Sequence, residues 1–215
     1  MKVLKGNKLI EITQSEFLTL IKTYSRIEID FGTGDGRFVY KNALNNLTTL
    51  YIGMDANEKQ MMKYSRAIQR KKLNNVILVL GSLEILPKEL YGFANVVYIH
   101  FPWGSLLKAI TQPIKSDLIK LSKLLKTGGI IKMILGYEKK FEPGEIQRNN
   151  LPELDLNYVR ENVIPIFQTI GLQNIKLEET QKTKLKEIES TWSKKLSFGK
   201  TRRFFKLDFV KSDNI

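Results

Sequence analysis

The sequence predicts an α/β fold in which a mostly parallel β-sheet carries helices on both faces. Short apolar segments of strand length alternate with segments of helical periodicity from residue 27 onward. That alternation is typical of parallel strands joined by crossover helices. A glycine-rich segment at 32–36 follows the first strand of the series, and open parallel sheets hold ligands at such turns. The 215 residues fit a single domain, 1–215.

Residues 1–12 precede this alternation and are predicted to form a β-hairpin. Apolar residues at 3–4 and 9–12 flank a turn at Gly6 and Asn7. Thr13 and Glu16 then have the spacing of a capping box, and apolar residues follow at helical intervals from Phe17. A short helix is therefore expected after the hairpin.

The remaining elements are expected in a regular order. Strands are predicted at residues 27–31, 49–54, 76–80, 96–99, 130–135, 175–177 and 203–210. Helices are predicted from residue 37 and at residues 57–72, 115–126, 156–170 and 183–196. Gly128 and Gly171 are typical of the residues that end the helices before them. Residues 137–156 contain Pro143 and Pro152, and we interpret them as a lid-like insertion rather than a domain linker.

Composition limits the classes of function. Lys and Arg number 35 against 22 Asp and Glu, so the net charge is +13, which favours an acidic partner such as nucleic acid. The absence of cysteine excludes disulfides, thiolate metal sites and cysteine nucleophiles. The single histidine, His100, excludes a histidine cluster, and no metal is expected. The longest uncharged run, 90–107, contains glycines and polar residues, so we predict a cytoplasmic protein without a membrane span.

The positive charge is concentrated in two segments. Residues 57–72 hold six Lys or Arg against one Glu, and residues 181–211 hold ten Lys or Arg against three Asp or Glu. In the first segment one face of the predicted helix carries a basic stripe, with a further lysine beside it: Lys59, Lys63, Arg66, Arg70 and Lys71. A solvated helix face is the alternative, but the excess of one sign favours contacts with phosphates.

The glycine-rich segment predicts a ligand site. Its spacing, Gly32, Gly34 and Gly36, differs from the dinucleotide-binding fingerprint. Asp55, at the end of the strand 49–54, is placed to accept both hydroxyls of a ribose. Asp30 is placed to face a cationic amine or sulfonium. A ligand with a ribose, an amino acid and a positive charge is S-adenosylmethionine. The alternative is a tight turn without a ligand, flanked by two surface aspartates.

Two further positions extend this site. Glu84, after the strand 76–80, is placed to meet an adenine amino group, and the alternative is a capping acid before Pro87. Methylases of exocyclic amines often carry an Asp or Asn before a Pro-Pro-aromatic loop after the fourth strand, and this chain has Phe101 there. That difference favours a ring nitrogen as the methyl acceptor, because a ring nitrogen already presents a lone pair.

Both tryptophans are candidates for stacking on a base. Trp103 follows Pro102 in this loop, and the alternative is that it plugs the edge of the sheet. Trp192 lies in a strongly basic region, and the alternative is the apolar face of an amphipathic helix with Leu185 and Ile188. His100 is interpreted as a strand-end residue rather than a catalyst.

Three motifs, in this order, resemble one family: Gly32 to Arg37, Phe101-Pro102-Trp103-Gly104, and Trp192 followed by Lys195-Leu196-x-Phe198-Gly199 and a basic run into Phe204-Phe205. The family is the aminoglycoside-resistance 16S rRNA methyltransferases that act on N1 of adenine 1408. The resemblance extends over nearly the whole chain. It implies a class I, Rossmann-like methyltransferase fold of seven strands with the last strand antiparallel, and S-adenosylmethionine as cofactor.

The resemblance also implies roles for residues. The cofactor would be lined by Asp30, Gly32, Thr33, Gly34, Gly36, Asp55, Leu83, Glu84, Phe101, Pro102, Gly104 and Ser105, with Ser190 and Thr191 nearby. Trp103 and Trp192 would hold a flipped adenine between them. By the resemblance, Lys195, Lys200 and Arg202 would hold rRNA phosphates, and the charge distribution adds Arg203 and the basic helix 57–72. The chain departs from the family at Leu83, where small residues are usual, and at Lys195 in place of an arginine.

The resemblance implies a monomer whose partner is 16S rRNA within the 30S ribosomal subunit. Two alternatives stay open at this point. One is another RNA-base methyltransferase, such as a tRNA guanine-N7 enzyme, which also carries a Phe-Pro and Trp loop after the fourth strand. The other is a non-catalytic RNA-binding module that retains the pocket.

Overall fold

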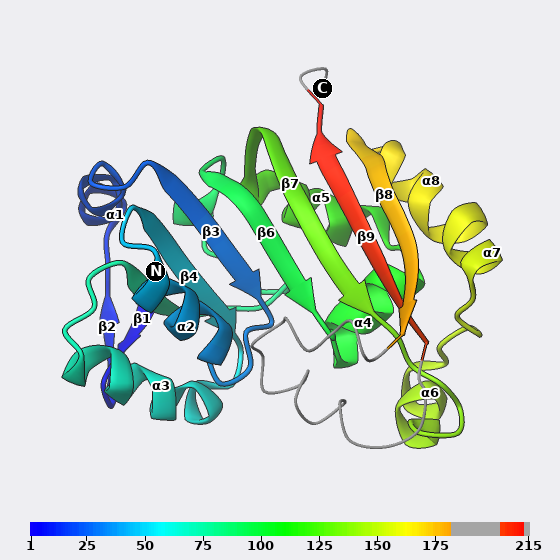
Figure 1. Cartoon of the computed structure of the whole chain (residues 1–215), viewed down its shortest axis with the longest axis horizontal. Coiled ribbons are helices and arrows are strands. Elements are labelled where there is room, and N and C mark those ends of the chain that lie inside the picture. The colour runs from blue at the N-terminus through cyan, green and yellow to red at the C-terminus, as the bar shows by residue number, and fades with distance from the viewer. Residues whose placement is uncertain (182–202, 213–215) are drawn as a thin grey trace.

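The computed structural model describes residues 1–181 and 203–212 (Figure 1). Its strands are β1 (Lys2–Lys5), β2 (Lys8–Glu11), β3 (Arg26–Phe31), β4 (Thr49–Asp55), β5 (Val76–Leu80), β6 (Ala94–His100), β7 (Leu125–Leu135), β8 (Leu172–Gln181) and β9 (Arg203–Lys211). Its α-helices are α1 (Gln14–Ile21), α2 (Arg37–Asn45), α3 (Glu58–Arg70), α4 (Gly104–Thr111), α5 (Lys115–Leu124), α6 (Pro143–Asn149), α7 (Leu156–Tyr158) and α8 (Ile164–Gln168).

All the strands of the described residues belong to one nine-stranded sheet in the order β2-β1-β5-β4-β3-β6-β7-β9-β8. The run from β5 to β7 is parallel, and β9 pairs antiparallel with both β7 and β8. Without the hairpin β1–β2 this is the seven-stranded arrangement with one antiparallel strand that the sequence predicted. The predicted hairpin is confirmed, and β1 joins the sheet antiparallel to β5.

Helices cover the two faces of the sheet unequally. On one face α2 and α3 pack over the β4–β5 side through a small core that includes Val39, Met61 and Leu78, and Figure 1 shows both helices in front of the sheet. The opposite face carries the larger core, in which Phe17 of α1, Leu118 of α5 and Phe167 of α8 pack against strand residues. The predicted capping box of α1 is present at Thr13 and Glu16.

The predicted boundary between the helix 115–126 and the following strand is wrong. Helix α5 ends at Leu124, and β7 begins at Leu125, where it pairs with Ala94 across a register shift. Gly128 and Gly129 therefore lie inside the strand and do not end a helix. A Cβ on Gly129 would lie 2.7 Å from the carbonyl oxygen of Ala94, so the glycine is required by the close approach of two strands.

The predicted helix 156–170 is interrupted. Residues Val159–Val163 form a π-helical turn between α7 and α8. Pro165 lies in the first turn of α8, and because proline has no N–H, it cannot make the i→i−4 hydrogen bond of a continuous α-helix. The strand predicted at 175–177 is longer, Leu172–Gln181. The predicted helix 183–196 lies outside the described residues.

Two helices were not predicted. Helix α4 follows the Phe101-Pro102-Trp103 loop directly, and α6 lies within the stretch 137–156 that was expected to be irregular. Both border the site described below. Among the described residues, no helix is long and apolar enough to cross a membrane.

Candidate active site

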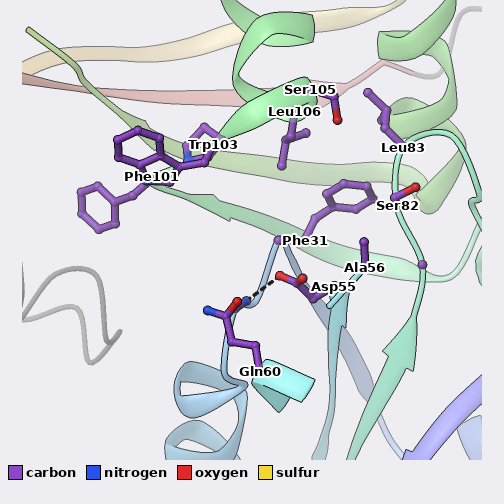
Figure 2. A pocket seen from close by; sticks show the side chains of 14 residues that line it. Phe31, Asp55, Ala56, Gln60, Ser82, Leu83, Phe101, Trp103, Ser105 and Leu106 are labelled. Carbon is purple, nitrogen blue, oxygen red and sulfur yellow. Dashed lines mark hydrogen bonds between the residues drawn. The ribbon is translucent and has the colours of Figure 1, made fainter. Parts of the chain in front are cut away.

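A pocket opens at the carboxyl ends of β3, β4, β5 and β6 (Figure 2). It lies where the strand order reverses between β3 and β6, the usual ligand position in an open parallel sheet. The residues that line it are Phe31, Gly32, Gly34, Asp55, Ala56, Gln60, Gly81, Ser82, Leu83, Phe101, Pro102, Trp103, Ser105 and Leu106. In Figure 2, Asp55 and Gln60 lie on one side of the pocket, and Trp103, Ser105 and Leu106 lie on the other.

The glycine loop is a tight turn held by β4. The N–H groups of Gly32 and Thr33 both donate to the carbonyl oxygen of Met54, at 2.8 and 2.9 Å. Gly32, Gly34 and Gly36 have φ values of 76°, 62° and 81°, which side-chain-bearing residues seldom adopt. The loop therefore needs glycine for its conformation, and it exposes backbone to the pocket.

Asp55 is oriented by backbone on both sides. Its Oδ2 accepts the Gly34 N–H at 2.8 Å, and its Oδ1 accepts the Asn57 N–H at 2.9 Å. Each carboxylate oxygen has two lone pairs, so each retains one for a ligand. A fixed carboxylate with two free acceptor positions is suited to a vicinal diol, as predicted for Asp55.

Asp30 is buried directly beneath the loop. Its Oδ2 accepts a hydrogen bond from the Thr33 hydroxyl at 2.6 Å, whereas its Oδ1 has no hydrogen-bond partner in the described part of the chain. Burial, together with the charges of Asp55 and Asp35, raises the pKa of Asp30 to about 7, against the lowering effect of the Thr33 hydrogen bond. A cation beside this carboxyl would favour its ionised form. Asp30 therefore fits the predicted amine or sulfonium, although its side chain does not line the pocket surface.

The loop after β6 is strained. Phe101 has a φ of 53°, a left-handed conformation that costs about 1–3 kcal/mol in a non-glycine residue. Its N–H donates to the carbonyl oxygen of Ile134 at 2.7 Å, and its ring packs edge-on against Phe204 at 5.6 Å. These contacts hold the turn that brings Pro102 and Trp103 to the pocket.

Helix α6 supplies a residue that the sequence did not indicate. The Glu145 carboxylate accepts the Gly104 N–H at 2.8 Å, and its other oxygen meets Arg148 at 3.3 Å. Glu145 is 8% exposed. Because Gly104 begins α4 and follows Trp103, this hydrogen bond ties the 137–156 insertion to the tryptophan loop. No local pattern marked Glu145, because its partner lies 41 residues away.

The residues after β5, which were predicted to meet the adenine of the donor, are not all in the pocket lining. Ser82 and Leu83 line the pocket, whereas Glu84 is exposed beside it. Hydrogen bonds from Ser82, from its own backbone and from Ser105 lower the pKa of Glu84. Its carboxylate is thus drawn toward the pocket rim that Ser82 and Ser105 form.

The basic stripe of α3 is exposed and begins next to the pocket. Gln60 lines the pocket, and Lys59, Lys63, Arg66, Arg70 and Lys71 are exposed along the helix and at its end. Met61 and Tyr64 are buried on the opposite side. The Arg66 guanidinium donates to the side chain of Asn7 in the hairpin turn. Arg203 is also exposed, and its N–H donates to Glu138 at 2.9 Å.

The remaining predicted site residues lie outside the described part of the chain: Ser190, Thr191, Trp192, Lys195, Lys200 and Arg202. Their positions therefore stay predictions. Within residues 1–181 and 203–212, no cluster of His, Asp and Glu is suited to holding a metal ion.

Comparison with known proteins identifies the family to which the chain belongs. The family profile "NpmA: 16S rRNA (adenine(1408)-N(1))-methyltransferase" matches residues 2–210. The chain belongs to this family of 16S rRNA (adenine(1408)-N(1))-methyltransferases.

Individual relatives agree over the full length. The Escherichia coli 16S rRNA (adenine(1408)-N(1))-methyltransferase is 33% identical over 212 residues, which cover 96% of this chain and 97% of the relative. A solved 30S ribosomal A1408 methyltransferase from an uncultured bacterium is 41% identical, with a TM-score of 0.78 over 98% of this chain and 100% of that one. The Catenulisporales acidiphilia 16S rRNA (adenine(1408)-N(1))-methyltransferase, solved with its cosubstrate S-adenosylmethionine, is 27% identical, with a TM-score of 0.87 over 100% and 98%.

The pocket fits the family's methyl donor, S-adenosylmethionine. Asp55 offers acceptors for ribose hydroxyls, and Asp30 offers a buried carboxyl with an unpartnered oxygen for a cation. Beyond the predicted residues, the lining includes Phe31, Ala56, Gln60, Gly81, Ser82 and Leu106. Phe31, Ala56, Ser82 and Leu106 adjoin predicted positions, and Gly81 follows the predicted strand 76–80. Gln60 reaches the pocket only through the packing of α3.

Proposed function

We propose that the chain carries out its family's reaction at this pocket, the transfer of a methyl group from S-adenosylmethionine to N1 of adenine 1408 of 16S rRNA in the 30S subunit. The observation that carries the proposal is the arrangement of the glycine loop, Asp55 and the Trp103 loop around one pocket, in a chain that matches the family from residue 2 to residue 210.

The donor binds along the carboxyl ends of β3 to β5. Asp55 accepts the ribose hydroxyls, and Asp30 supports the cationic end through its unpartnered Oδ1. The adenine end lies against Ser82 and Leu83, with Glu84 at the rim. The donor supplies an electrophilic methyl group, and the chain's own residues orient it toward Trp103.

The target adenine leaves its stack and lies between Trp103 and Trp192. Flipping a base costs a few kcal/mol, and stacking on aromatic side chains contributes about 1–3 kcal/mol per base. Two indoles are therefore enough to offset the cost. The basic side chains hold the surrounding phosphates: Lys63, Arg66, Arg70 and Lys71 of α3, with Lys195, Lys200, Arg202 and Arg203 from the carboxyl-terminal segment.

The chemical step needs no general base. N1 of adenine carries a free lone pair in the plane of the ring, so no proton has to leave before the methyl group is transferred. Positioning of the two reactants supplies most of the acceleration. The product is a cationic base, and the indole faces stabilise the positive charge as it develops.

The product explains resistance to aminoglycosides. Methylation removes the N1 hydrogen-bond acceptor and places a positive charge beside a polycationic drug, so contacts of the drug with this base are lost. A tRNA guanine-N7 enzyme, the alternative left open by the tryptophan loop, differs in the RNA that it modifies. We propose a monomer that works in the cytoplasm, where its ribosomal substrate is found.

The base-stacking assignment is tested by Trp103→Ala and Trp192→Ala, each assayed with labelled donor on 30S subunits. Loss of one indole removes about 1–3 kcal/mol of stacking, so we expect a loss of methylation of roughly 5- to 150-fold with nearly unchanged donor affinity. Primer extension maps the modified nucleotide. Full activity of both variants would contradict the stacking role, and modification of tRNA alone would contradict the rRNA substrate.

The ribose assignment is tested by Asp55→Ala and calorimetric titration with S-adenosylmethionine. Hydrogen bonds to a charged acceptor contribute about 1.5–3 kcal/mol, which corresponds to a Kd weakened roughly 10- to 100-fold. Asp117→Ala is the matched control, because Asp117 pairs with Lys120 on the surface of α5, outside the pocket lining. Equal donor affinities in Asp55→Ala and Asp117→Ala would contradict the assignment of Asp55 to the ribose hydroxyls.

A further inference from the structure

His100 forms a buried pair with Asp30 that the reaction described above does not use. The two side chains project from neighbouring strands, and His100 Nδ1 lies 3.7 Å from Asp30 Oδ1. The side chains are 9% and 4% exposed. Neither of these two atoms has a hydrogen-bond partner in the described part of the chain. Two unpartnered polar atoms that face each other in a buried site are uncommon, and each calls for an explanation.

Few groups of the described residues around the pair could form a hydrogen bond with either atom. From β4 comes Asp55, and from the glycine loop comes Asp35; both acids disfavour a charge on Asp30. Helix α2 covers the pair with the ring of Phe38, 4.8 Å from His100. Tyr98 of β6 packs against His100, but its hydroxyl donates to Glu28 at 3.1 Å. Among residues 1–181 and 203–212, His100 is thus the polar side chain whose unpartnered nitrogen faces Asp30 Oδ1.

We propose that His100 is a positioning residue that serves as the hydrogen-bond partner of Asp30 whether or not that carboxyl carries a proton, and that it thereby links donor binding to the release of a proton. The inference rests on the proposed function, since it assumes that the cationic end of S-adenosylmethionine lies at Asp30. A small rotation that shortens the separation by about 1 Å makes the hydrogen bond.

Imidazole suits this role because its tautomers exchange donor and acceptor. When Asp30 is protonated, its O–H donates to an unprotonated Nδ1, and Nε2 carries the ring proton. When the donor's cation arrives, the carboxyl proton moves to Nδ1 and the Nε2 proton leaves to water. The ring is neutral before and after, Asp30 becomes a carboxylate that accepts from Nδ1–H, and one proton is released in total.

The titration of the two groups agrees with this geometry. The pKa of Asp30 is raised to about 7, so the donor-free protein holds a proton on this carboxyl below that pH. Burial lowers the pKa of His100 to about 4, so the ring stays neutral over the same range. Donor binding that requires an ionised Asp30 must therefore weaken about tenfold for each pH unit below 7.

The test is calorimetric titration of the full chain with S-adenosylmethionine from about pH 6 to pH 9, for the wild type, His100→Leu and His100→Asn. Leucine fills the space without a polar atom, whereas asparagine places an amide nitrogen near the position of Nδ1. The donor's own amine titrates equally in all three experiments, so it cancels in the ratio of variant Kd to wild-type Kd.

For His100→Leu the ionised carboxyl loses its donor, and the pKa of Asp30 rises further. If the pKa of Asp30 rises by one unit, the Kd of His100→Leu at pH 6 should be roughly ten times that of the wild type. This ratio should fall toward one at pH 9, where Asp30 is ionised in both proteins. His100→Asn should stay within about twofold of the wild type throughout. A ratio for His100→Leu that is the same at every pH indicates a packing role only and overturns the proposal, as does an asparagine variant that behaves like leucine.

A further variant keeps the test decisive if His100→Leu does not fold. Asp30→Asn cannot ionise, so its affinity should be weak and without the wild-type fall below pH 7. Retention of that fall would overturn the proposal. A wild-type protein that does not bind the donor at pH 9 contradicts the proposed function. Wild-type binding without a fall below pH 7 leaves the proposed function intact and overturns the proton release at Asp30, and with it the role of His100.

Discussion

Asp30 shows how a single residue in the site lowers the stability of the fold. The carboxyl is 3% exposed and has acidic neighbours, so its charged form is disfavoured in the folded protein. In the unfolded chain it titrates near the ordinary value of 3.8. Between about pH 4 and pH 7 the folded protein therefore binds a proton at Asp30 that the unfolded chain does not. The free energy of unfolding falls as the pH rises through this range, because above the folded-state pKa the fold has to bury a carboxylate.

Replacement of Asp30 by Asn should stabilise the fold at alkaline pH. At pH 8 the wild type has to bury a carboxylate, whereas the amide is neutral and its oxygen still accepts from Thr33. We expect a gain in the free energy of unfolding on the order of 2–4 kcal/mol at pH 8, decreasing toward zero at pH 4. Urea denaturation at several pH values measures it.

Asp117→Asn is the control for this experiment, because Asp117 is a surface residue of α5 paired with Lys120. It should change the stability by less than about 1 kcal/mol. An Asp30→Asn protein that is no more stable at pH 8 than at pH 4, relative to the wild type, would show that burial does not raise the pKa of this carboxyl.

Helices α4 and α6 act together on the tryptophan loop. Helix α4 begins at Gly104, immediately after Trp103, and α6 sends Glu145 to the Gly104 N–H. This contact fixes the first turn of α4 from outside the sheet. The insertion at 137–156 therefore contributes to the active-site geometry, although its residues are distant in sequence from every motif in the pocket.

Glu145→Ala should lower methylation on 30S subunits by roughly 5- to 150-fold, because the half-buried Gly104 N–H of the tryptophan loop loses its partner, at a cost of about 1–3 kcal/mol. Donor affinity should change less, since Asp55 and the glycine loop are untouched. Methylation rates and calorimetric Kd values separate the two effects.

Two variants control for the loss of charge and of the surface ion pair. Glu145→Gln keeps an acceptor oxygen and should retain most of the activity. Arg148→Ala removes only the guanidinium that lies 3.3 Å from the Glu145 carboxylate, and this side chain is 75% exposed. The variant should therefore methylate 30S subunits at nearly the wild-type rate. If Glu145→Ala and Arg148→Ala had the same effect, the hydrogen bond to Gly104 would not be the cause.

The distribution of charge over the whole molecule matches a large anionic substrate. The net charge is +13, and the exposed basic residues of α3 begin beside the pocket. Lys123, in the last turn of α5, and Lys126, at the start of β7, are exposed at the opposite end of the parallel strands. Only the first group is placed to contact RNA whose adenine enters the pocket.

Binding to 30S subunits should therefore depend steeply on salt, and the basic residues of α3 should contribute a measurable part of that dependence. Lys63→Gln with Arg70→Gln should reduce the slope of log Kd against log salt concentration by about 0.7–0.9 for each lost phosphate contact. Lys123→Gln with Lys126→Gln removes the same charge from the other end and should leave the slope nearly unchanged. Equal slopes in the two double variants would contradict an RNA interface on α3.

Local patterns predicted most of the fold. The hairpin, the capping box at Thr13, the glycine loop and each strand of the described chain depend on neighbouring residues, such as an alternation of side chains or a turn that requires glycine. The glycine loop at 32–36, together with Asp30 before it and Asp55 after the next strand, was likewise sufficient to predict the methyl donor. The motif at 101–104 indicated a second loop at the same edge of the sheet.

The roles of some residues could not be predicted, because they depend on contacts between segments that are distant in the sequence. Gly128 and Gly129 were interpreted as a helix end, because the reason for Gly129, the carbonyl oxygen of Ala94, is 35 positions away along the chain. Gln60 and Glu145 reach the site from helices whose placement depends on packing against the sheet. The pair of His100 and Asp30 exists only because β3 and β6 are neighbours.

The amino-acid sequence by itself thus determined the fold class, the methyl donor and the acceptor atom, because alternating apolar segments and short motifs indicate them without knowledge of the strand order. The tertiary structure decided which side chains support those residues from a distance and how burial changes their protonation. The physical reason is that hydrogen-bond partners and desolvation depend on spatial neighbours, and strand order brings together residues that no local pattern connects.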